Sequence, residues 1–436
     1  CGRAPLPVCG THCLSPATPG ETPSMLTRLH ARRFKSLLDF SMEFPRLTVL
    51  FGPNASGKSN VLEAAQTLSQ CATARTLADA LEGSIRGYPL EAFSFPPGGL
   101  SAMLRREELS LSLHADLSIA DERYRYGVEI SAQPVGGSLA VRDETLTALT
   151  RRGVPSSRPP VIGLTEGTLR VRAQGGGAHP RHEPLGLNHT LLSDTRFSGN
   201  GYSVIERCRS EFEAWRIYYL DPRVAMRSAR PPAEVTDIGV LGGDIAPFLY
   251  RLKAEEPRCF EGARRALVSI VPSVQGLAVD LDDRRGILDV QITQDGCAYS
   301  SRVISEGTLR VLALCAIAVN PWAKGLVAFE EPENGVHPRR LELIAQLLVS
   351  MAIDQGRQVI VTTHSPLFCS AVLELTRGDR DHARLYAVRM GPDGTVAEPL
   401  SDPDALLEAA QISDGFAATS EDNALQGMLV RGWLDE

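Results

Sequence analysis

The feature that most constrains the fold of this chain is a glycine-rich segment, residues 52–59, which reads Gly-Pro-Asn-Ala-Ser-Gly-Lys-Ser. It fits the pattern G-x-x-x-x-G-K-[ST] and lies between the apolar run 47–51 and a stretch with helical spacing of apolar residues from Val61 to Leu68. This order predicts a buried strand, a loop and a helix. The backbone N–H groups of such a loop wrap phosphate groups, and the positive helix N-terminus points at them.

The last two residues of the loop have specific chemistry. We expect the Lys58 ammonium to reach the β- and γ-phosphates of a nucleotide and the Ser59 hydroxyl to bind Mg²⁺. A chance glycine turn is the alternative, but the flanking strand and helix are those that a phosphate-binding loop requires. The residues that we expect to contact the nucleotide here are Gly52, Asn54, Ser56, Gly57, Lys58, Ser59 and Asn60.

Two adjacent carboxylates, Glu330 and Glu331, follow the apolar run 326–329. At the end of a buried strand such a pair suits two tasks, because one carboxylate binds Mg²⁺ and the other polarises the attacking water. The alternative is a solvated acidic turn, since a third carboxylate follows at Glu333. The phosphate-binding loop in the same chain favours the functional interpretation.

Another buried-strand pattern, residues 358–363, ends at His364. An isolated histidine is usually structural or exposed. The carboxyl ends of parallel strands, however, form the edge of a sheet at which ligands bind. We therefore predict that the imidazole of His364 lies within reach of the γ-phosphate.

The segment Ser-Glu-Gly-Thr-Leu-Arg at 305–310 begins a predicted helix that continues as an apolar run to residue 319. Ser305 suits the N-cap of that helix, so capping alone is its alternative role. A near copy, Thr-Glu-Gly-Thr-Leu-Arg at 165–170, precedes a glycine-rich segment that cannot continue as a buried helix. We predict a hairpin turn at the first copy and a helix N-terminus facing phosphate only at the second.

Composition limits the class of protein. Acidic residues outnumber basic ones, 52 against 45, which excludes a uniformly basic nucleic-acid-binding surface but not a local basic stripe. The longest apolar run, 311–319, falls far short of the roughly 18 residues that a membrane span requires. Nine scattered cysteines, an odd number, indicate small buried side chains in a reducing compartment. We expect a cytoplasmic protein without a membrane partner.

The order of these patterns divides the chain into five parts. The first, rich in Pro, Gly, Thr and Ser, is expected to be a disordered leader. In the β-rich part, apolar and polar residues alternate over 109–130, which predicts an antiparallel hairpin with one buried face. The parts are a leader (1–24), the first part of a core with the phosphate-binding loop (25–100), an antiparallel β lobe with loops (101–204), a helical insert (205–273), and the second part of the core with a C-terminal tail (274–436).

Four motifs occur in the order GPNASGKSN, SEGTLR, LVAFEEPENGVHP and VTTHSP. This order resembles that of the ABC-type ATPases of the RecF/SMC branch. It is more closely similar to the AAA-family predicted bacterial ATPases that include the OLD-type and Septu-defence ATPases. The sequence Arg-Phe-Lys-Ser-Leu at 33–37 is also typical of that branch, and the resemblance spans Met25 to about Ala371. It implies an α/β fold: an ABC-type P-loop ATPase head with a β-rich lobe and a helical insert.

The resemblance implies roles for the carboxylates and the histidine. Glu331 would be the catalytic base and His364 the switch histidine, while Glu330 and Ser59 would hold Mg²⁺. ATP and Mg²⁺ are thus the implied cofactors. The wider superfamily usually has aspartate at the position of Glu330.

The resemblance also implies a homodimer. Ser305 and Gly307 would form the signature motif, which closes on ATP held by the opposite subunit of a head-to-tail pair. The sequence has Glu306 where the signature motif usually has its first glycine. Fast turnover is less expected for that reason.

Two functions remain open at this stage. The first is DNA repair or maintenance, in which the ATP-closed dimer clamps DNA. The second is a sensor or regulatory subunit of an anti-phage defence or toxin system, which acts with a separately encoded nuclease or toxin. A transporter ATPase is disfavoured, because no membrane-coupling segment is visible. The 72 residues after His364 are too few for the Toprim nuclease domain of OLD-type enzymes, and no sustained heptad predicts a long coiled-coil arm.

Overall fold

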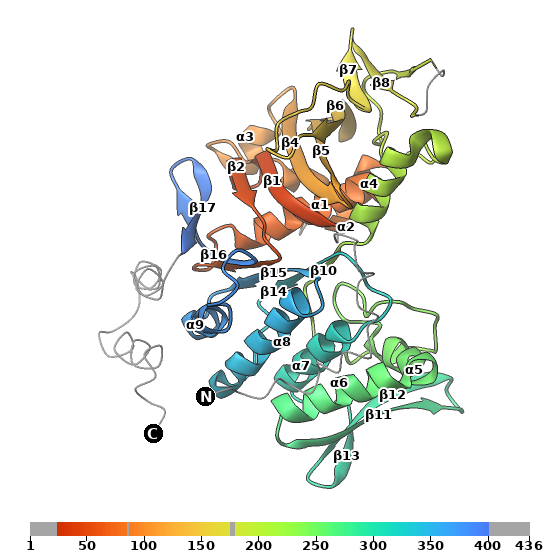
Figure 1. Cartoon of the computed structure of the whole chain (residues 1–436), viewed down its shortest axis with the longest axis vertical. Helices are drawn as coiled ribbons and strands as arrows, with labels where there is room; N and C mark the ends of the chain where they lie inside the picture. The colour runs from red at the N-terminus through yellow and green to blue at the C-terminus, as the bar shows by residue number, and fades with distance from the viewer. Residues whose placement is uncertain (1–23, 85–86, 175–178, 401–436) are drawn as a thin grey trace.

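The computed structural model describes residues 24–84, 87–174 and 179–400. The predicted leader, except for Ser24, lies outside this part, as does the tail from residue 401 onward. The described chain forms three β-sheets and the helices that cover them (Figure 1). This is the mixed α/β class that the sequence predicts.

The central sheet has six strands, of which the first five are parallel and the last is antiparallel to its neighbour. Three adjacent strands are the predicted apolar runs, and nearly all of their residues are buried, as expected where helices cover both faces of a sheet. In spatial order the strands are β10 (Arg216–Tyr218), β14 (Leu326–Glu330), β15 (Gln358–Thr363), β3 (Leu47–Phe51), β16 (Ala383–Gly391) and β17 (Gly394–Leu400).

The central sheet separates two hydrophobic cores. In β3, Leu47, Val49 and Phe51 face one core and Leu50 faces the other, because side chains alternate along a strand. On the first side (Figure 1) lie α5 (Ile245–Glu255), α6 (Pro257–Ile270), α7 (Glu306–Ala318), α8 (Leu341–Ile353) and α9 (Pro366–Leu375). On the second side lie α1 (Lys58–Thr73), α2 (Leu77–Ser84), α3 (Gly99–Met103) and α4 (Ser203–Glu213).

The β lobe is an eight-stranded antiparallel sheet that packs on α1. The hairpin predicted over 109–130 is confirmed, with Ile119 opposite Glu122 at its turn. The hairpin predicted at the first Thr-Glu-Gly-Thr copy is also confirmed, and Glu166 and Gly167 have the positive φ angles, 51° and 77°, that a tight two-residue turn needs. In spatial order the strands are β2 (Leu37–Glu43), β1 (Met25–Phe34), β4 (Leu109–Ile119), β5 (Glu122–Gln133), β6 (Ser138–Leu149), β7 (Ile162–Thr165), β8 (Thr168–Val171) and β9 (Arg181–Glu183).

The helices within 205–273 do not form the single insert that the sequence suggests. The helix α4 packs on α1 in the core of the β lobe, whereas α5 and α6 pack beside α7 in the other core. Between them β10 joins the edge of the central sheet, so the chain crosses from one core to the other at this point. Short 3₁₀ turns complete the described elements: η1 (Pro89–Ala92), η2 (Asn200–Tyr202) and η3 (Pro338–Arg340).

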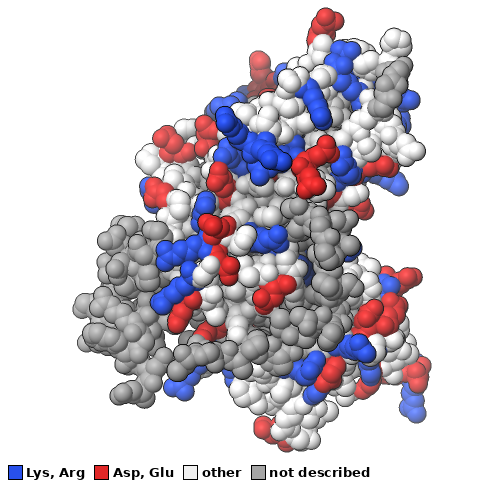
Figure 2. Space-filling view, viewed as in Figure 1, with Lys and Arg blue, Asp and Glu red and all other residues white. Residues whose placement is uncertain are grey.

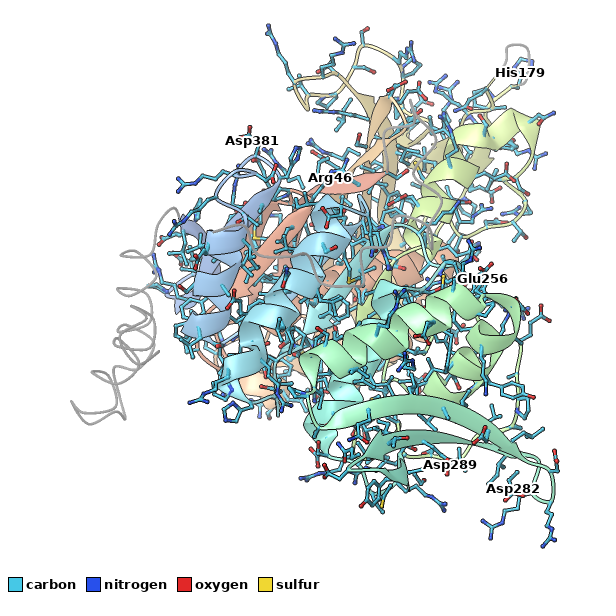
Figure 3. The ribbon with its side chains drawn as sticks, turned by 60° about the horizontal axis from the view of Figure 1, so that its bottom comes forward. Arg46, His179, Glu256, Asp282, Asp289 and Asp381 are labelled. Atoms are coloured by element: carbon cyan, nitrogen blue, oxygen red, sulfur yellow. The ribbon has the colours of Figure 1, made fainter. Side chains whose placement is uncertain are left out.

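A third sheet follows α5 and α6 in the chain. It is antiparallel, is separate from the central sheet and packs on α5 and α6. Figure 3 shows Asp289 on this sheet and Asp282 at its outer end. Its strands are β11 (Val274–Asp282), β12 (Ile287–Gln294) and β13 (Cys297–Ser300). Within the described residues, no helix is both long and apolar enough to cross a bilayer.

One carboxylate, Glu144 on β6, is fully buried in the β lobe. Its oxygens accept hydrogen bonds from the backbone N–H groups of Leu191 (2.6 Å) and Leu192 (2.8 Å) and from the hydroxyl of Tyr126 (3.2 Å). Burial raises the pKa of Glu144 to about 7, although these donors oppose the rise. Through these hydrogen bonds the Glu144 side chain attaches the segment 191–192 to the β lobe.

We expect Glu144→Ala to lower the free energy of unfolding by about 3 kcal/mol, because three buried donors lose their acceptor and a cavity forms. Urea denaturation followed by circular dichroism measures this loss. The control is Glu129→Ala, which removes a half-exposed carboxylate from the neighbouring strand β5. Equal urea midpoints for the two variants would show that Glu144 does not stabilise the lobe.

Candidate active site

Three loops from distant parts of the sequence meet at one edge of the central sheet. They follow β3, β14 and β15, which are adjacent and parallel, so their carboxyl ends lie together. In the register of these strands Glu330 pairs with Thr362, and Thr363 pairs with Phe51. The predicted phosphate-binding loop, the carboxylate pair and the histidine are therefore brought to one place.

The glycines of the phosphate-binding loop are required by its close packing. Gly57 has a φ of 99°, and a Cβ atom built there would lie 2.0 Å from the Thr395 hydroxyl oxygen. A Cβ atom at Gly52 would lie 2.1 Å from the carbonyl oxygen of Val388. The hairpin of β16 and β17 thus leaves no space for side chains at these positions. Since α1 begins at Lys58, the helix N-terminus faces the loop.

Lys58 is nearly buried and bends back over the loop. Its Nζ atom donates hydrogen bonds of 2.7 Å to the carbonyl oxygens of Gly52 and Pro53. Burial lowers the pKa of Lys58, whereas the nearby carboxylates, Glu331 first among them, act to raise it. The ammonium is thus a cation whose present acceptors are neutral carbonyl oxygens, and phosphate oxygens are stronger acceptors for it.

The predicted metal ligands contact each other. Ser59 Oγ donates a hydrogen bond of 2.5 Å to Oε1 of Glu330. The described residues contain no group of three or more His, Cys, Asp or Glu side chains placed to hold a metal ion. A hydroxyl and one carboxylate fit Mg²⁺, which usually takes few protein ligands and completes its shell with phosphate oxygens and water.

Glu331 contacts His364 across the two loops. The two side chains approach to 3.5 Å between Oε1 and Nδ1, and Asn334 donates a 2.5 Å hydrogen bond to Oε2 of Glu331. The interaction with His364 lowers the pKa of Glu331 to about 2 and raises the pKa of the imidazole. Glu331 also has a positive φ of 45°, and its N–H donates to the Thr362 carbonyl oxygen at 3.0 Å. The carboxylate is therefore ionised and fixed in place, which suits orienting a water molecule.

The segment that begins at Ser305 also lies beside this site. Ser305 is the N-cap of α7, and its Oγ accepts a 3.2 Å hydrogen bond from the Thr308 N–H, so the capping role is real. A Cβ atom at Gly307 would lie 2.1 Å from the carbonyl oxygen of Gly335, in the loop that carries Glu331. Glu306, which replaces the usual glycine, forms a 2.8 Å ion pair with an exposed arginine, Arg223.

A second layer of polar residues supports the loop, and sequence reasoning missed part of it. The amide of Asn60, expected to contact nucleotide, donates a 2.7 Å hydrogen bond to Ser36 Oγ. Ser36 Oγ lies 2.6 Å from the Thr395 hydroxyl, which donates to the Ser56 carbonyl oxygen at 3.2 Å. Ser36 belongs to the recognised Arg-Phe-Lys-Ser-Leu segment. No local pattern marks Thr395, because its position arises from the pairing of β17 with β16 and of β16 with β3.

Glu333 is a further residue of this site, and the sequence analysis assigned it no role. A solvated acidic turn was the alternative that its position suggested, but the side chain is only 5% exposed. Thr363 Oγ1 donates a hydrogen bond to its Oε1. Asn54, by contrast, is exposed at the surface of the loop.

The chain matches the model of one protein family over residues 47–370. That family is described as "AAA domain, putative AbiEii toxin, Type IV TA system". The match covers the phosphate-binding loop, the signature segment, the carboxylate pair and the histidine. No curated protein matches the chain.

Solved structures with a similar fold include heads of SMC proteins. The SMC head bound to the C-terminal winged-helix domain of ScpA is 14% identical with a TM-score of 0.49, covering 88% of this chain and 99% of that one. The SMC head domain from Thermotoga maritima is 14% identical with a TM-score of 0.40, covering 87% and 100%. The recombination mediator protein RecF-ATPrS of the RecFOR pathway is 13% identical with a TM-score of 0.41, covering 88% and 100%. Likenesses at this level concern the fold, and no residue assignment depends on them.

We predict that the His364 imidazole titrates above pH 6.5 and that Glu331→Gln lowers this pKa, because the amide removes the negative charge beside the ring. The pH titration of the ring signals by NMR, with His364→Gln to assign them, measures both values. The folded pKa of His364 exceeds its unfolded value, whereas the folded pKa of Glu331 lies below its unfolded value. The pair therefore stabilises the protein most between the ordinary pKa values of the two groups, about 4.3 and 6.5. The stabilisation is lost as the pH rises through the folded pKa of His364, and it is also lost as the pH falls and Glu331 is protonated. An unchanged His364 titration in Glu331→Gln would contradict the contact.

Proposed function

The chain belongs to this AAA-domain family, whose model matches more than half of its 436 residues, and from that premise we propose that it is an ATP-binding and ATP-hydrolysing switch protein. The observation that carries the proposal is the convergence of Lys58, the Ser59–Glu330 pair and the Glu331–His364 pair at one sheet edge. In the proposed roles they supply a phosphate-binding cation, a magnesium site and a water-orienting carboxylate, the parts that phosphoryl transfer to water requires.

In this proposal Lys58 leaves the carbonyl oxygens of its loop to bind the β- and γ-phosphates. Ser59 and Glu330 hold Mg²⁺, which supplies positive charge to the phosphate oxygens when bound. Gly52 and Gly57 leave the backbone of the loop without side chains at these positions, in keeping with close phosphate binding by backbone N–H groups. The proposed nucleotide contacts are Gly52, Asn54, Ser56, Gly57, Lys58, Ser59 and Asn60.

Glu331 is the proposed catalytic base. Its low pKa means that it orients and polarises the attacking water rather than holding a proton at neutral pH. His364, which contacts Oε1 of Glu331, is proposed to contact the γ-phosphate. A protonated imidazole there would favour the charge that develops during phosphoryl transfer.

We further propose that two copies form a head-to-tail homodimer around two ATP molecules. Ser305 and Gly307 at the positive start of α7 would face the γ-phosphate of the partner. The segment before α5 is fastened beside this start, since Arg223 pairs with Glu306 and Arg227 donates a 2.6 Å hydrogen bond to the Ile304 carbonyl oxygen. Exposed apolar side chains gather on these segments, as is typical of an interface. They are Val224, Val240, Leu241 and Val303.

For the biological process, we propose action on DNA in repair or maintenance, or regulation of a toxin or nuclease effector. The family description, which names a toxin and a type IV TA system, favours the second process. The face in Figure 2 carries Lys and Arg side chains interspersed with Asp and Glu, so its charge does not favour DNA over a protein partner. ATP-dependent binding of duplex DNA by the purified protein would favour the first.

The substitution Glu331→Gln tests the proposed activity. We expect it to retain ATP binding but to lower hydrolysis by about 100-fold or more, because the amide cannot polarise water. A dimer should then accumulate with ATP and Mg²⁺, as measured by size-exclusion chromatography. Lys58→Ala is the control that should bind no ATP by calorimetry. Normal hydrolysis by Glu331→Gln would place the base elsewhere, and normal ATP binding by Lys58→Ala would remove the phosphate-loop assignment.

The substitution Ser305→Arg tests the head-to-tail dimer. We expect each subunit to bind ATP normally but not to dimerise, because a bulky side chain at the start of α7 blocks the partner's nucleotide. Mixing Ser305→Arg with Lys58→Ala should restore some ATPase activity, since one composite site of the mixed dimer then carries neither defect. The control is Thr165→Arg in the hairpin copy of the motif. Loss of activity in Thr165→Arg but not in Ser305→Arg would show that the copy at 165–170, and not the one at 305–310, faces the partner's nucleotide.

A further inference from the structure

Glu333 is a buried carboxylate to which the roles above assign no function. Its Oε1 accepts the Thr363 hydroxyl, whereas its Oε2 is buried without a hydrogen-bond partner among the described residues. Burial raises the pKa of Glu333, as expected for a carboxylate with one unsatisfied oxygen. Such a group is costly to bury, so its presence beside the Glu331–His364 pair calls for an explanation other than packing.

The partner of Glu333, Thr363, links all three loops of the site. Its hydroxyl donates to Glu333, in the carboxylate loop, and accepts a 2.9 Å hydrogen bond from the Ser365 N–H. Its carbonyl oxygen accepts the Gly52 N–H of the phosphate-binding loop at 3.3 Å. Thr363 and Ser365 are the residues on either side of His364. The hydrogen bonds therefore fix the backbone before and after the histidine.

The same carboxylate loop fixes the other member of the pair. Asn334 holds one oxygen of Glu331, and the Gly335 carbonyl oxygen packs against Gly307 at the start of α7. The loop thus supplies the carboxylate and, through Glu333, braces the strand end that supplies the imidazole. The Glu331–His364 contact is half-exposed and 3.5 Å long, and an ion pair of this kind contributes little free energy by itself. The buried hydrogen bond between Thr363 and Glu333, which we call the brace, therefore positions this contact.

We propose that Glu333 is a positioning residue for ATP hydrolysis. Through the Thr363 hydroxyl it sets the backbone of His364 and so holds the imidazole against Glu331. This inference rests on the proposed function, in which Glu331 and His364 act on ATP. Since neither Glu333 nor Thr363 needs to touch the nucleotide, the brace affects turnover and leaves ATP binding unchanged.

The first experiment compares Thr363→Val with Thr363→Ser, because valine breaks the brace without altering charge and serine retains the hydroxyl. We expect the kcat of Thr363→Val to fall roughly tenfold or more, with KM for ATP unchanged within about twofold. Thr363→Ser should stay within about twofold of the wild type. Glu333→Ala should resemble Thr363→Val, whereas Glu333→Gln keeps an acceptor oxygen and should be milder. The double variant Glu333→Ala/Thr363→Val should be no slower than either single variant, because both break one link.

The second experiment is independent of ATP. In NMR titrations the pKa of His364 should fall in Thr363→Val, as is also expected for Glu331→Gln, and should stay near the wild-type value in Thr363→Ser. The exposed carboxylate Glu374 on α9 supplies a matched control, and Glu374→Ala should leave the titration unchanged. If Glu333→Ala does not fold, the comparison of Thr363→Val with Thr363→Ser still tests the proposed role of Glu333.

The outcomes separate the two proposals. A wild-type protein that does not hydrolyse ATP would overturn the proposed function, while the His364 titration would still test the brace. Wild-type kcat in Thr363→Val would overturn the role of Glu333 in turnover. A slower Thr363→Val with an unmoved His364 titration would also overturn the inference, since the effect would then not pass through the histidine.

Discussion

The register of three adjacent parallel strands, β14, β15 and β3, is the constraint on which the candidate site depends. A slip of one residue between neighbours would reverse which side chains face each of the two cores, because side chains alternate along a strand. Leu47, Val49 and Phe51 would then exchange cores with Leu50. The packing on both faces of the sheet therefore fixes the register. The register in turn places the loops that follow β3, β14 and β15 close enough for their side chains to contact each other.

The polar groups of the site form hydrogen bonds and an ion pair with other groups of the same chain. Lys58 binds loop carbonyl oxygens, Ser59 binds Glu330, and Glu331 contacts both Asn334 and a histidine. A ligand has to replace several of these contacts at once, so a multiply charged group can compete where a neutral one cannot.

The parts of the fold that the sequence predicts are those with strong local signals. The apolar runs that become β3, β14 and β15 are buried on both faces, and each leads directly into a segment that a motif identifies. The alternation over 109–130 likewise fixes a hairpin. The positions of β10 and α4 could not be predicted, because β10 has only three residues and α4 is assigned to its core by tertiary packing.

The supporting residues of the site were hidden from sequence reasoning for a related reason. Thr395 lies on β17 and contacts the phosphate-binding loop because β17 pairs with β16, which in turn pairs with β3 across more than 300 residues. Glu333 resembles a surface residue in sequence, since it follows two other glutamates and a proline. Its burial depends on how the loop after β14 turns inward beside Thr363.

The place of β3 in the sheet has a consequence for synthesis on the ribosome. This strand is made before its two neighbours, β15 and β16, which lie more than 300 residues later in the sequence. A nascent chain therefore carries an apolar strand with two unpaired edges while those residues are synthesised, a state prone to wrong pairing. The nucleotide loop that follows β3 can acquire its final shape only when nearly all of the described chain has emerged. Long-range pairing of this kind also slows folding.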